Sequence, residues 1–540
     1  MNILEQIVEK RKTDLKKYGA CLGADIPPQR KRKNPVPFIN GKTVILEVKR
    51  ASPSKGDIAP SLNAEETALS YIQAGAGAIS VLTEKHYFKG SLDDLMAVAK
   101  TVDAHAQKSP NARQPAVLRK DFLIEPEEID VAYRAGADAV LLISRILSKE
   151  ELCAMADKCT RLGMTAFIEL RMRDDVEKLN AVASFLGERK NLIACGVNAR
   201  DLSNFSIDLL KPCTMLPLLT DFPVVFESGV RSPEAASFTG GLGFTGLLLG
   251  EGAAKNPSQA SSLVSSFVNA SATKNSKAWL SYTSRLSKAE SSCEKSHCSH
   301  SEKKYRRPLV KVCGLTSLQD ALYATMGGAD FLGFIFWKGS QRNANSALVK
   351  EVREVLSEEF TKTCQDEHIF AAGSDDMAPL LVGVLVDLET EEAKEALELA
   401  KKGSLDFIQL HGQKAVEQFY SRPELLSLPH YCVVNVSCEK DLELFDSLRI
   451  KGQPRILVDS KAHGAVGGTG LCIDKSILHK ISEKTKLWVA GGISVSNVEE
   501  FLSCSPELID VNSGVEKEPG VKDSEALLEF FSKIDELCSY

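Results

Sequence analysis

The sequence predicts an α/β chain made of two tandem (β/α)8 TIM barrels joined by a Ser/Lys-rich linker. Three observations support this fold class. The 540 residues suffice for two domains of about 250 residues each. Short aliphatic runs alternate with amphipathic Ala-, Glu- and Lys-rich stretches in both halves, and one polar window separates the halves. Continuous apolar strands that alternate with helices indicate parallel strands buried on both faces.

Each half contains eight expected strands, which fits a closed barrel of about 250 residues. An open doubly wound sheet is the alternative, although it rarely needs eight units. The strands expected in the first half are Thr43–Val48, Ala78–Leu82, Ala116–Leu118, Ala139–Ile143, Thr165–Ile168, Leu192–Val197, Pro223–Phe226 and Gly246–Leu249. Those expected in the second half are Leu309–Val312, Phe331–Phe336, Leu381–Val386, Phe407–Leu410, Tyr431–Val436, Arg455–Val458, Leu487–Ala490 and Leu508–Val511. In AGAGAIS, AGADAVL and GGADFLG, a glycine follows a helix where the chain needs a left-handed residue.

The polar window places the boundaries at residues 1–270, 271–307 and 308–540. The window holds nine Lys or Arg, three Asp or Glu and ten Ser. Because a stretch this polar buries too little apolar surface to offset the entropy lost on ordering, most of it is expected to be an exposed linker. Trp279 and Tyr282 are expected to pack on the end of the first domain. The spacing of Cys293, His297, Cys298 and His300 fits no structural zinc site, so no metal is expected.

Composition excludes several classes of protein. The net charge of -6 argues against binding nucleic acid through bulk charge, and no apolar run is long enough to span a membrane. The cysteines lie mostly in apolar segments and no signal peptide precedes them, which favours reduced thiols and a cytoplasmic location. The basic run at residues 30–33 could be a nuclear signal, but a solvated segment before the first strand is the preferred interpretation.

In a barrel of this kind the chemistry lies at the carboxyl ends of the strands. The first half places two lysines, three carboxylates and other polar groups there: Glu47, Lys49, Lys120, Glu169, Asn198, Glu227 and Ser228. Any one of them could be an exposed loop charge, but their convergence indicates a site, because buried charges must pair or work. A desolvated lysine among cations becomes a better acid, and a carboxylate in an apolar wall a better base. The glycine-rich ends at Gly229 and Gly250 offer backbone N–H groups to phosphate.

The motifs ILEVKRASPSKG, SVLTEKHYFKGS, LRKDF and FESGV resemble indole-3-glycerol-phosphate synthase, in the same order, across residues 1–270. That family closes an indole ring on 1-(o-carboxyphenylamino)-1-deoxyribulose 5-phosphate with loss of carbon dioxide and water. The resemblance implies that Lys120 is the general acid and Glu169 the base of the later dehydration. It also implies supporting roles for the remaining positions. Glu47 and Asn198 would orient the substrate, and Lys49 would hold its anions. Glu227 and Ser228 would complete the polar wall, and Phe88 and Phe122 would lie on the two faces of the aromatic ring. Phosphate would be bound by Ser52, Gly229 and Gly250.

The second half carries a different pair of candidate proton-transfer groups. Cys313 ends the first strand and Asp459 ends the sixth, so both should face the same mouth. A lone cysteine at a strand end is usually a small buried hydrophobe, but a thiolate opposite a carboxylic acid makes an acid–base pair. The segments VAGGIS and IDVNSG at the last two strand ends again suit phosphate.

The motifs KVCGLT, QLHG, VAGGIS and DVNSGVEKEPGVKD resemble phosphoribosylanthranilate isomerase over residues 308–540. That family opens a ribosylamine ring and shifts a proton, an Amadori rearrangement. The resemblance implies that Asp459 protonates the ring oxygen and Cys313 removes the C2 proton. It further implies a set of binding positions. Arg342 would pair with the anthranilate carboxylate, Asp510 would support the iminium, and Gly491, Gly492, Ser513 and Gly514 would surround phosphate. His411 is expected to be structural or peripheral.

Some positions depart from the family patterns. Glu251 follows Gly250 where serine is common, and Ala199 follows Asn198 where a second asparagine is common. The loop before Arg342 lacks a proline, and Asn435 replaces a lysine often seen after the fifth strand. Residues 360–380 look like an insertion in a surface loop. None of these changes removes a proton-transfer group.

Together the resemblances imply a bifunctional enzyme of tryptophan biosynthesis, in which the isomerase product is the synthase substrate. The expected ligands are small phosphorylated anthranilate derivatives, with no cofactor, no metal, no nucleic acid and no membrane. Association with other tryptophan-pathway enzymes stays open. The intermediate is expected to diffuse between two independent mouths. The alternatives are one inactive half, a phosphosugar-binding scaffold, or a histidine-pathway type of isomerase, which would use two aspartates.

Overall fold

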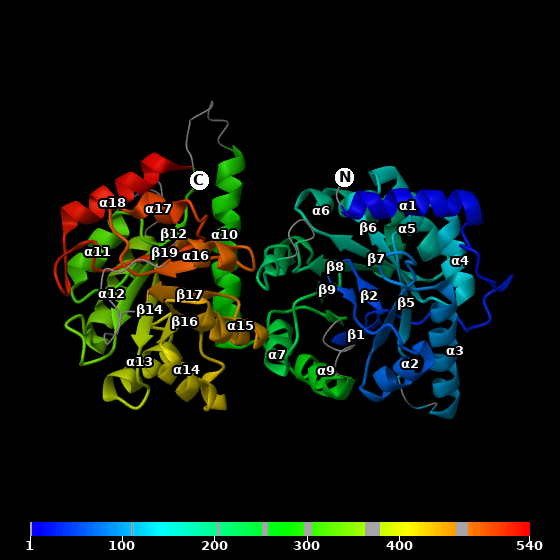
Figure 1. Ribbon diagram of the computed structural model, residues 1–540, viewed down its shortest axis with the longest axis horizontal. Helices are drawn as coiled ribbons and strands as arrows, with labels where there is room; N and C mark the ends of the chain where they lie inside the picture. The colour runs from blue at the N-terminus through cyan, green and yellow to red at the C-terminus, as the bar shows by residue number, and fades with distance from the viewer. Residues whose placement is uncertain are drawn as a thin grey trace. The chain divides into compact units, whose positions relative to one another are not determined.

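The computed structural model describes residues 3–53, 55–109, 111, 113–201, 206–250, 257–295, 305–361, 378–460 and 474–539. The chain forms two compact units, Met1–Ala272 and Thr273–Tyr540. Each unit contains a closed barrel of eight parallel strands with helices around it (Figure 1). The predicted fold class is therefore confirmed, and every predicted strand lies within two residues of the observed bounds.

The first barrel has the strand order β1-β10-β9-β8-β7-β6-β5-β4. Its strands are β1 (Thr43–Val48), β4 (Ala78–Leu82), β5 (Ala116–Lys120), β6 (Ala139–Ile143), β7 (Thr165–Leu170), β8 (Ile193–Asn198), β9 (Val224–Glu227) and β10 (Gly246–Leu249). Its helices are α1 (Ile3–Tyr18), α2 (Ala64–Gln73), α3 (Leu92–Lys108), α4 (Glu127–Ala135), α5 (Lys149–Arg161), α6 (Asp174–Leu186), α7 (Pro233–Gly241) and α9 (Ala260–Val268). A short hairpin, β2 (Ala51–Ser52) with β3 (Gly56–Asp57), follows β1.

The second barrel has its strands in sequence order around the ring. They are β12 (Leu309–Val312), β13 (Phe331–Ile335), β14 (Leu380–Leu385), β15 (Phe407–His411), β16 (His430–Val436), β17 (Ile456–Ser460), β18 (Trp488–Ala490) and β19 (Leu508–Val511). The helices of this unit are α10 (Lys274–Lys295), α11 (Leu318–Met326), α12 (Ser346–Thr361), α13 (Glu391–Lys402), α14 (Gln413–Tyr420), α15 (Leu442–Ile450), α16 (Lys475–Ser482), α17 (Val498–Leu502) and α18 (Ser524–Leu537). Two short strand pairs complete it, β20 (Glu516–Glu518) with β21 (Val521–Lys522) and β11 (Tyr305–Arg306) with β22 (Cys538–Ser539).

Local sequence signals set the helix ends. Ser148 and Glu151 form a capping box at the start of α5, which satisfies backbone N–H groups that have no partner within the helix. The predicted left-handed glycines are confirmed at Gly75, Gly136 and Gly328, whose φ angles are 87°, 102° and 94°. These turns return the chain from each helix to the next strand.

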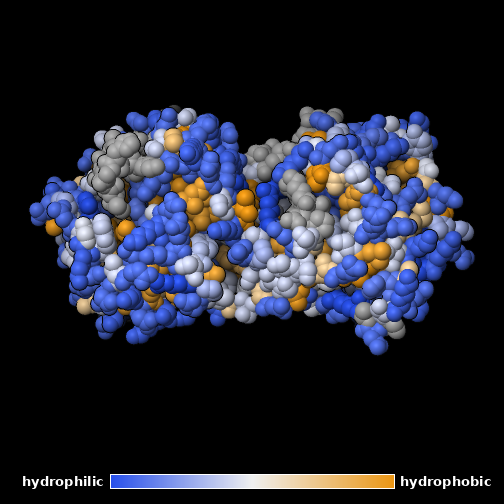
Figure 2. Space-filling model, turned by 60° about the horizontal axis from the view of Figure 1, so that its bottom comes forward, coloured by the Kyte–Doolittle hydropathy of each residue, from blue (hydrophilic) through white to orange (hydrophobic). Residues whose placement is uncertain are grey.

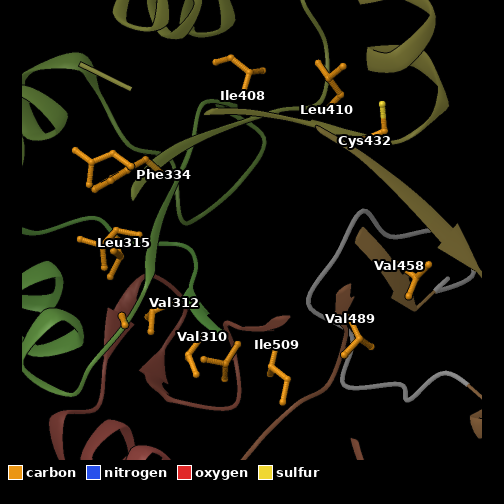
Figure 3. Packing of buried hydrophobic residues seen from close by; sticks show 14 of the residues in the cluster. Val310, Val312, Leu315, Phe334, Ile408, Leu410, Cys432, Val458, Val489 and Ile509 are labelled. Carbon is orange, nitrogen blue, oxygen red and sulfur yellow. The ribbon is translucent and has the colours of Figure 1, made fainter. Parts of the chain in front are cut away.

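Side chains alternate between the inside and the outside of each barrel. In the second barrel Val310, Val312, Ile408 and Leu410 belong to one buried cluster that also includes helix residues such as Ala321 (Figure 3). The strand positions between them therefore point into the barrel. This alternation decides which residues line each barrel interior and, at the strand ends, each mouth.

The helix α10 corrects the prediction of an exposed linker. Trp279 and Tyr282 are fully buried in the second unit, whereas the sequence analysis placed them on the first. The Trp279 ring centroid lies 4.9 Å from that of Phe407 and 6.0 Å from that of Trp488. The Tyr282 hydroxyl donates a 2.6 Å hydrogen bond to Glu507. The prediction failed because the average composition of the window gives no weight to two large aromatic side chains on one face of a helix. These side chains close the second barrel at the amino-terminal ends of its strands.

The basic run before β1 is not wholly solvated, which corrects a second expectation. The guanidinium of Arg30 lies 2.7 Å from the carboxylate of Asp138, and that of Arg32 lies 2.9 Å from it. Both arginine side chains are almost fully buried, while Lys31 and Lys33 are exposed. These ion pairs therefore hold the basic segment against Asp138, the residue that precedes β6.

The face of the molecule shown in Figure 2 is mostly hydrophilic, with apolar residues in small patches. Among the described residues no helix has the length and apolar character to cross a membrane. In the same part of the chain no group of three or more metal-ligating side chains could hold a metal ion. Of the four candidate zinc ligands in the polar window, His297, Cys298 and His300 lie outside the described residues.

Candidate active sites

The first barrel opens into a cavity of about 180 Å³ at the carboxyl ends of its strands. Most of the predicted site residues line it: Glu47, Lys49, Ser52, Phe88, Lys120, Phe122, Glu169, Asn198, Ser228, Gly229 and Gly250. Glu227 is not among the lining residues, but its carboxylate forms an ion pair with Lys120, which lines the cavity. The structure thus brings together residues from the ends of six strands, and the most distant of these residues, Glu47 and Gly250, are 203 positions apart in the chain.

Lys120 is the centre of this cluster. Its ammonium lies 3.0 Å from Glu47 and 3.2 Å from Glu227, and Lys49 lies 3.2 Å from the other oxygen of Glu47. The lysines and carboxylates therefore pair as expected, but the expectation that Lys120 becomes a better acid among cations is wrong, because its close neighbours are carboxylates. Burial alone would lower the pKa of Lys120, but Glu47, Glu227 and Glu169 outweigh burial and raise it. Lys120 is thus a fully protonated donor.

The three carboxylates differ in their affinity for protons. Burial raises the pKa of Glu47, but Lys120 and Lys49 overcome this effect and lower it to about 2. Burial also raises the pKa of Glu227, here to about 7, because Glu169 and Glu47 add repulsion. Burial likewise raises the pKa of Glu169, against the attraction of Lys120 and a hydrogen bond from Asn198. One site therefore holds a permanent anion and two carboxyl groups that can take up protons.

The remaining predicted positions shape the cavity. The Phe88 and Phe122 ring centroids are 6.0 Å apart, within the range of two aromatic rings in contact, so the rings must separate before a third aromatic ring fits between them. Ser228 has a φ of 72°, unusual for a residue with a side chain, at the turn after β9. A Cβ atom on Gly250 would lie 2.7 Å from Glu47, so only glycine lets the backbone approach the carboxylate.

Sequence reasoning missed three arginines and one helix of this site. Arg171, Arg200 and Arg231 line the cavity, each two residues beyond a predicted polar residue or glycine. The spacing was the available signal, because Arg171 follows Glu169 and Arg200 follows Asn198 on the same side of a strand end. The helix α1 also reaches the cavity, through Ile3, Leu4 and Ile7. Only the fold could reveal this contact.

The second barrel opens into a cavity of about 100 Å³, also at the carboxyl ends of its strands. The predicted site residues that line it are Cys313, Arg342, Asp459, Gly491, Gly492, Asp510 and Ser513, and His411, which was expected to be structural or peripheral, lines it as well. Gly514 does not line it; a Cβ atom there would lie 2.0 Å from the carbonyl oxygen of Ile493, so glycine allows two chain segments to touch. Cys313, which directly follows β12, and Asp459 on β17 therefore line one cavity.

A buried lysine that the sequence analysis missed lies beneath this cavity. The Lys311 ammonium donates to Asp510 at 2.6 Å, to Gln409 at 2.6 Å and to the Cys313 sulfur at 3.4 Å. Burial raises the pKa of the Cys313 thiol above its usual value, and the attraction of Lys311 offsets this rise only in part. The signal was a charged residue two positions before Cys313 in a strand, hence on its inward side.

Arg342 is held by a carboxylate before any substrate arrives. Its guanidinium donates to both oxygens of Glu516, at 3.0 Å to Oε1 and 2.7 Å to Oε2, and Lys522 lies 2.9 Å from the same carboxylate. His411 is buried, and its Nε2 has no hydrogen-bond partner within the described structure. Burial lowers the pKa of His411 to about 4, with a further contribution from Lys311, so the imidazole is neutral.

Two departures from the family patterns cannot be placed. Glu251 and nearly all of the suggested 360–380 insertion lie outside the described residues. Asn435 is described, and it pairs with Asp459 in the register of β16 and β17.

Comparison with known proteins agrees with both cavities. The family model for indole-3-glycerol phosphate synthase matches residues 4–265, and that for N-(5'-phosphoribosyl)anthranilate isomerase matches residues 310–533. A tryptophan biosynthesis protein of Phytophthora nicotianae is 31% identical over 87% of this chain and 87% of its own length. The chain belongs to this family of tandem tryptophan biosynthesis proteins. Its first half is the synthase barrel and its second half the isomerase barrel.

Two further relatives complete the comparison. A multifunctional tryptophan biosynthesis protein of Schizosaccharomyces pombe is 32% identical over 92% of this chain, which spans 59% of that protein. Among solved structures, phosphoribosyl anthranilate isomerase of Thermotoga maritima is 27% identical, with a TM-score of 0.33 over 42% of this chain and 98% of its own. The chain thus spans about three fifths of the length of the Schizosaccharomyces relative.

Proposed function

We propose that the chain catalyses two consecutive steps of tryptophan biosynthesis. The isomerase barrel converts N-(5-phosphoribosyl)anthranilate to 1-(o-carboxyphenylamino)-1-deoxyribulose 5-phosphate. The synthase barrel closes that product to indole-3-glycerol phosphate with loss of carbon dioxide and water. The observation that carries the proposal is the pairing of each family match with a cavity lined by its own proton-transfer groups.

In the isomerase barrel, Asp459 protonates the ring oxygen as the ribosylamine opens. Cys313, as thiolate, then removes the C2 proton of the resulting iminium, which Asp510 stabilises. Arg342 binds the anthranilate carboxylate in exchange for part of its contact with Glu516, since a planar guanidinium suits a bidentate carboxylate. Gly491, Gly492 and Ser513, the residues that would bind the phosphate, line the same cavity.

In the synthase barrel, Lys120 protonates the substrate ketone as the ring carbon attacks it. The raised pKa of Glu169 suits a group that accepts a proton in the dehydration. The substrate carries a carboxylate and a phosphate, and Arg171, Arg200, Arg231 and Lys49 provide positive charge around the same cavity. Glu47, held as an anion, keeps Lys120 charged and in position.

We also place the enzyme in the cytoplasm. Buried cysteines such as Cys159, Cys195 and Cys432 are free thiols, as expected of a protein in a reducing compartment. Association with other enzymes of the pathway remains a proposal without a specific surface behind it.

One assay tests both activities. Phosphoribosylanthranilate is added to the purified chain, its fluorescence decay is followed, and the products are resolved by chromatography. The proposal expects decay together with the appearance of indole-3-glycerol phosphate. Decay that stops at the deoxyribulose compound would refute the synthase half, and absence of decay would refute the isomerase half. Direct supply of the deoxyribulose compound tests the synthase half by itself.

A further inference from the structure

Lys311 is a fully buried lysine that no part of the proposed mechanism uses. It is the third residue of β12, and its side chain points into the barrel because Val310 and Val312 point outward. A buried ammonium is costly unless it is paired and hydrogen-bonded. Its position beneath the cavity, and not at the surface, therefore needs an explanation.

The neighbours of Lys311 fix its ammonium in one place. Asp510 accepts one hydrogen bond and stands beside Lys311 in the register of β12 and β19. Gln409 accepts a second, and the Tyr431 hydroxyl donates a 2.7 Å hydrogen bond to the same Gln409 oxygen. Both anchors come from strands, so the ammonium is held rigidly. Its third short contact is the sulfur of Cys313.

We propose that Lys311 is a positioning residue of the isomerase barrel, whose fixed ammonium lies against the Cys313 sulfur and stabilises the thiolate form that accepts the substrate proton. The inference deepens the proposed function and rests on it. Lys311 stays protonated throughout: the proton leaves the substrate C2 and ends on the Cys313 sulfur, which no longer needs the positive charge once it is a thiol. An unassisted buried thiol would be mostly protonated near neutrality and unable to act as a base.

The other charges around Cys313 do not replace Lys311. Asp510 on β19 raises the pKa of the thiol, and Lys522 on β21 lowers it by less than Lys311 does. Arg342, Asp459 and His411 line the same cavity. Arg342 and Lys522 are both paired with Glu516, which reduces their effect on the sulfur. Lys311 is the nearest of these cations.

The test measures the thiolate directly. Peptide-resolved mass spectrometry follows alkylation of Cys313 by iodoacetamide from pH 6 to pH 10 in the whole chain. The exposed Cys438 is the internal reference. Replacing Lys311→Met is expected to move the Cys313 alkylation midpoint up by one pH unit or more and to leave that of Cys438 unchanged. The acid limb of isomerase kcat/KM should shift upward equally, with activity partly recovered at high pH.

Two further variants make the test decisive. Lys311→Arg keeps the positive charge and should retain a midpoint close to that of the wild type. If Lys311→Met does not fold, Gln409→Leu removes one anchor, lets the ammonium move toward Asp510 and should raise the midpoint by a smaller amount. Unchanged Cys313 titration in a folded Lys311→Met, or in Gln409→Leu, overturns the inference. Because alkylation needs no substrate, this result is independent of whether the isomerase activity itself is found.

Discussion

The two barrels place a buried lysine at different depths. In the synthase barrel Lys120 ends its strand and faces the cavity, among Glu47, Glu227 and Glu169. In the isomerase barrel Lys311 lies below the cavity and supports the residue that faces it. The same scaffold therefore uses one lysine as a group that meets substrate and the other as a fixed charge beneath a thiol. The position along the strand, not the residue type, separates the two roles.

Aromatic side chains close both barrels at the end opposite the cavity, although the two sequences differ there. In the synthase barrel the fully buried Phe38, just before β1, packs on Phe167 with ring centroids 5.2 Å apart. In the isomerase barrel Trp279 and Tyr282 of α10 play this part. In both units an aromatic side chain from the segment before the first strand fills the barrel floor. The cavities at the other end are therefore built on packed interiors.

The largest expected effect tests whether Lys120 acts on substrate. Lys120→Met should lower synthase kcat by about 1000-fold or more, within the range of general acid catalysis together with loss of the charge cluster. Isomerase activity should stay within twofold. Parallel assays of both reactions on one preparation make the measurement. Exposed Lys89, replaced by Met, is the control and should leave both activities unchanged. Equal loss of both activities would contradict separate sites.

The floor of the isomerase barrel gives the next effect. Trp279→Ala removes a buried indole and should destabilise the second unit by about 3–5 kcal/mol. Urea unfolding, followed by loss of each activity, should show an early transition for the isomerase and an unchanged one for the synthase. Lys277→Ala, at an exposed position of the same helix, should change neither. If Trp279→Ala weakens only the synthase, the assignment of α10 to the second unit is wrong.

The charge cluster of the synthase barrel should make its stability depend on pH. Glu227 has a folded pKa of about 7, above its unfolded value, so the folded barrel binds a proton between about pH 4.5 and 7 and loses stability as pH rises through that window. The loss is on the order of 1–3 kcal/mol. Glu227→Gln should flatten the dependence, as measured by urea midpoints at pH 5 and pH 8. If the urea midpoint of the wild type is the same at pH 5 and pH 8, the raised pKa of Glu227 in the folded barrel is contradicted.

The smallest effect concerns the substrate carboxylate in the isomerase barrel. Arg342→Lys keeps the charge but loses the two-pronged contact, so KM should rise about tenfold with little change in kcat. Initial rates against phosphoribosylanthranilate concentration give both constants. A fall in kcat at constant KM would instead assign Arg342 to the chemical step.

Sequence patterns predicted the strands and most of the residues at each mouth, because buried parallel strands are continuous apolar runs and their ends carry the polar side chains. Lys311 and Arg171 escaped notice although alternation from Cys313 and Glu169 pointed to them. The contribution of α1 to the first cavity, and of Trp279 to the second barrel, could not be deduced. Both depend on where a helix docks, which local composition does not encode.

The charges of the first cavity illustrate the same limit. The sequence placed Lys120 and the carboxylates at strand ends without their distances, so the direction in which the pKa of Lys120 shifts was predicted wrongly. The order of strands around the ring sets those distances. Only the closed barrel shows that Glu47 and Glu227 approach Lys120 from two sides.

Complementation between two inactive variants tests the central claim most directly: that each barrel holds a complete and separate set of proton-transfer groups. Lys120→Met and Cys313→Ala are each supplied with phosphoribosylanthranilate, singly and mixed in equal amounts. Each variant alone should form no indole-3-glycerol phosphate, and the mixture should form it, because the free intermediate passes from one chain to the other. A mixture as inactive as its components would show that the two reactions need one intact chain and would contradict the account.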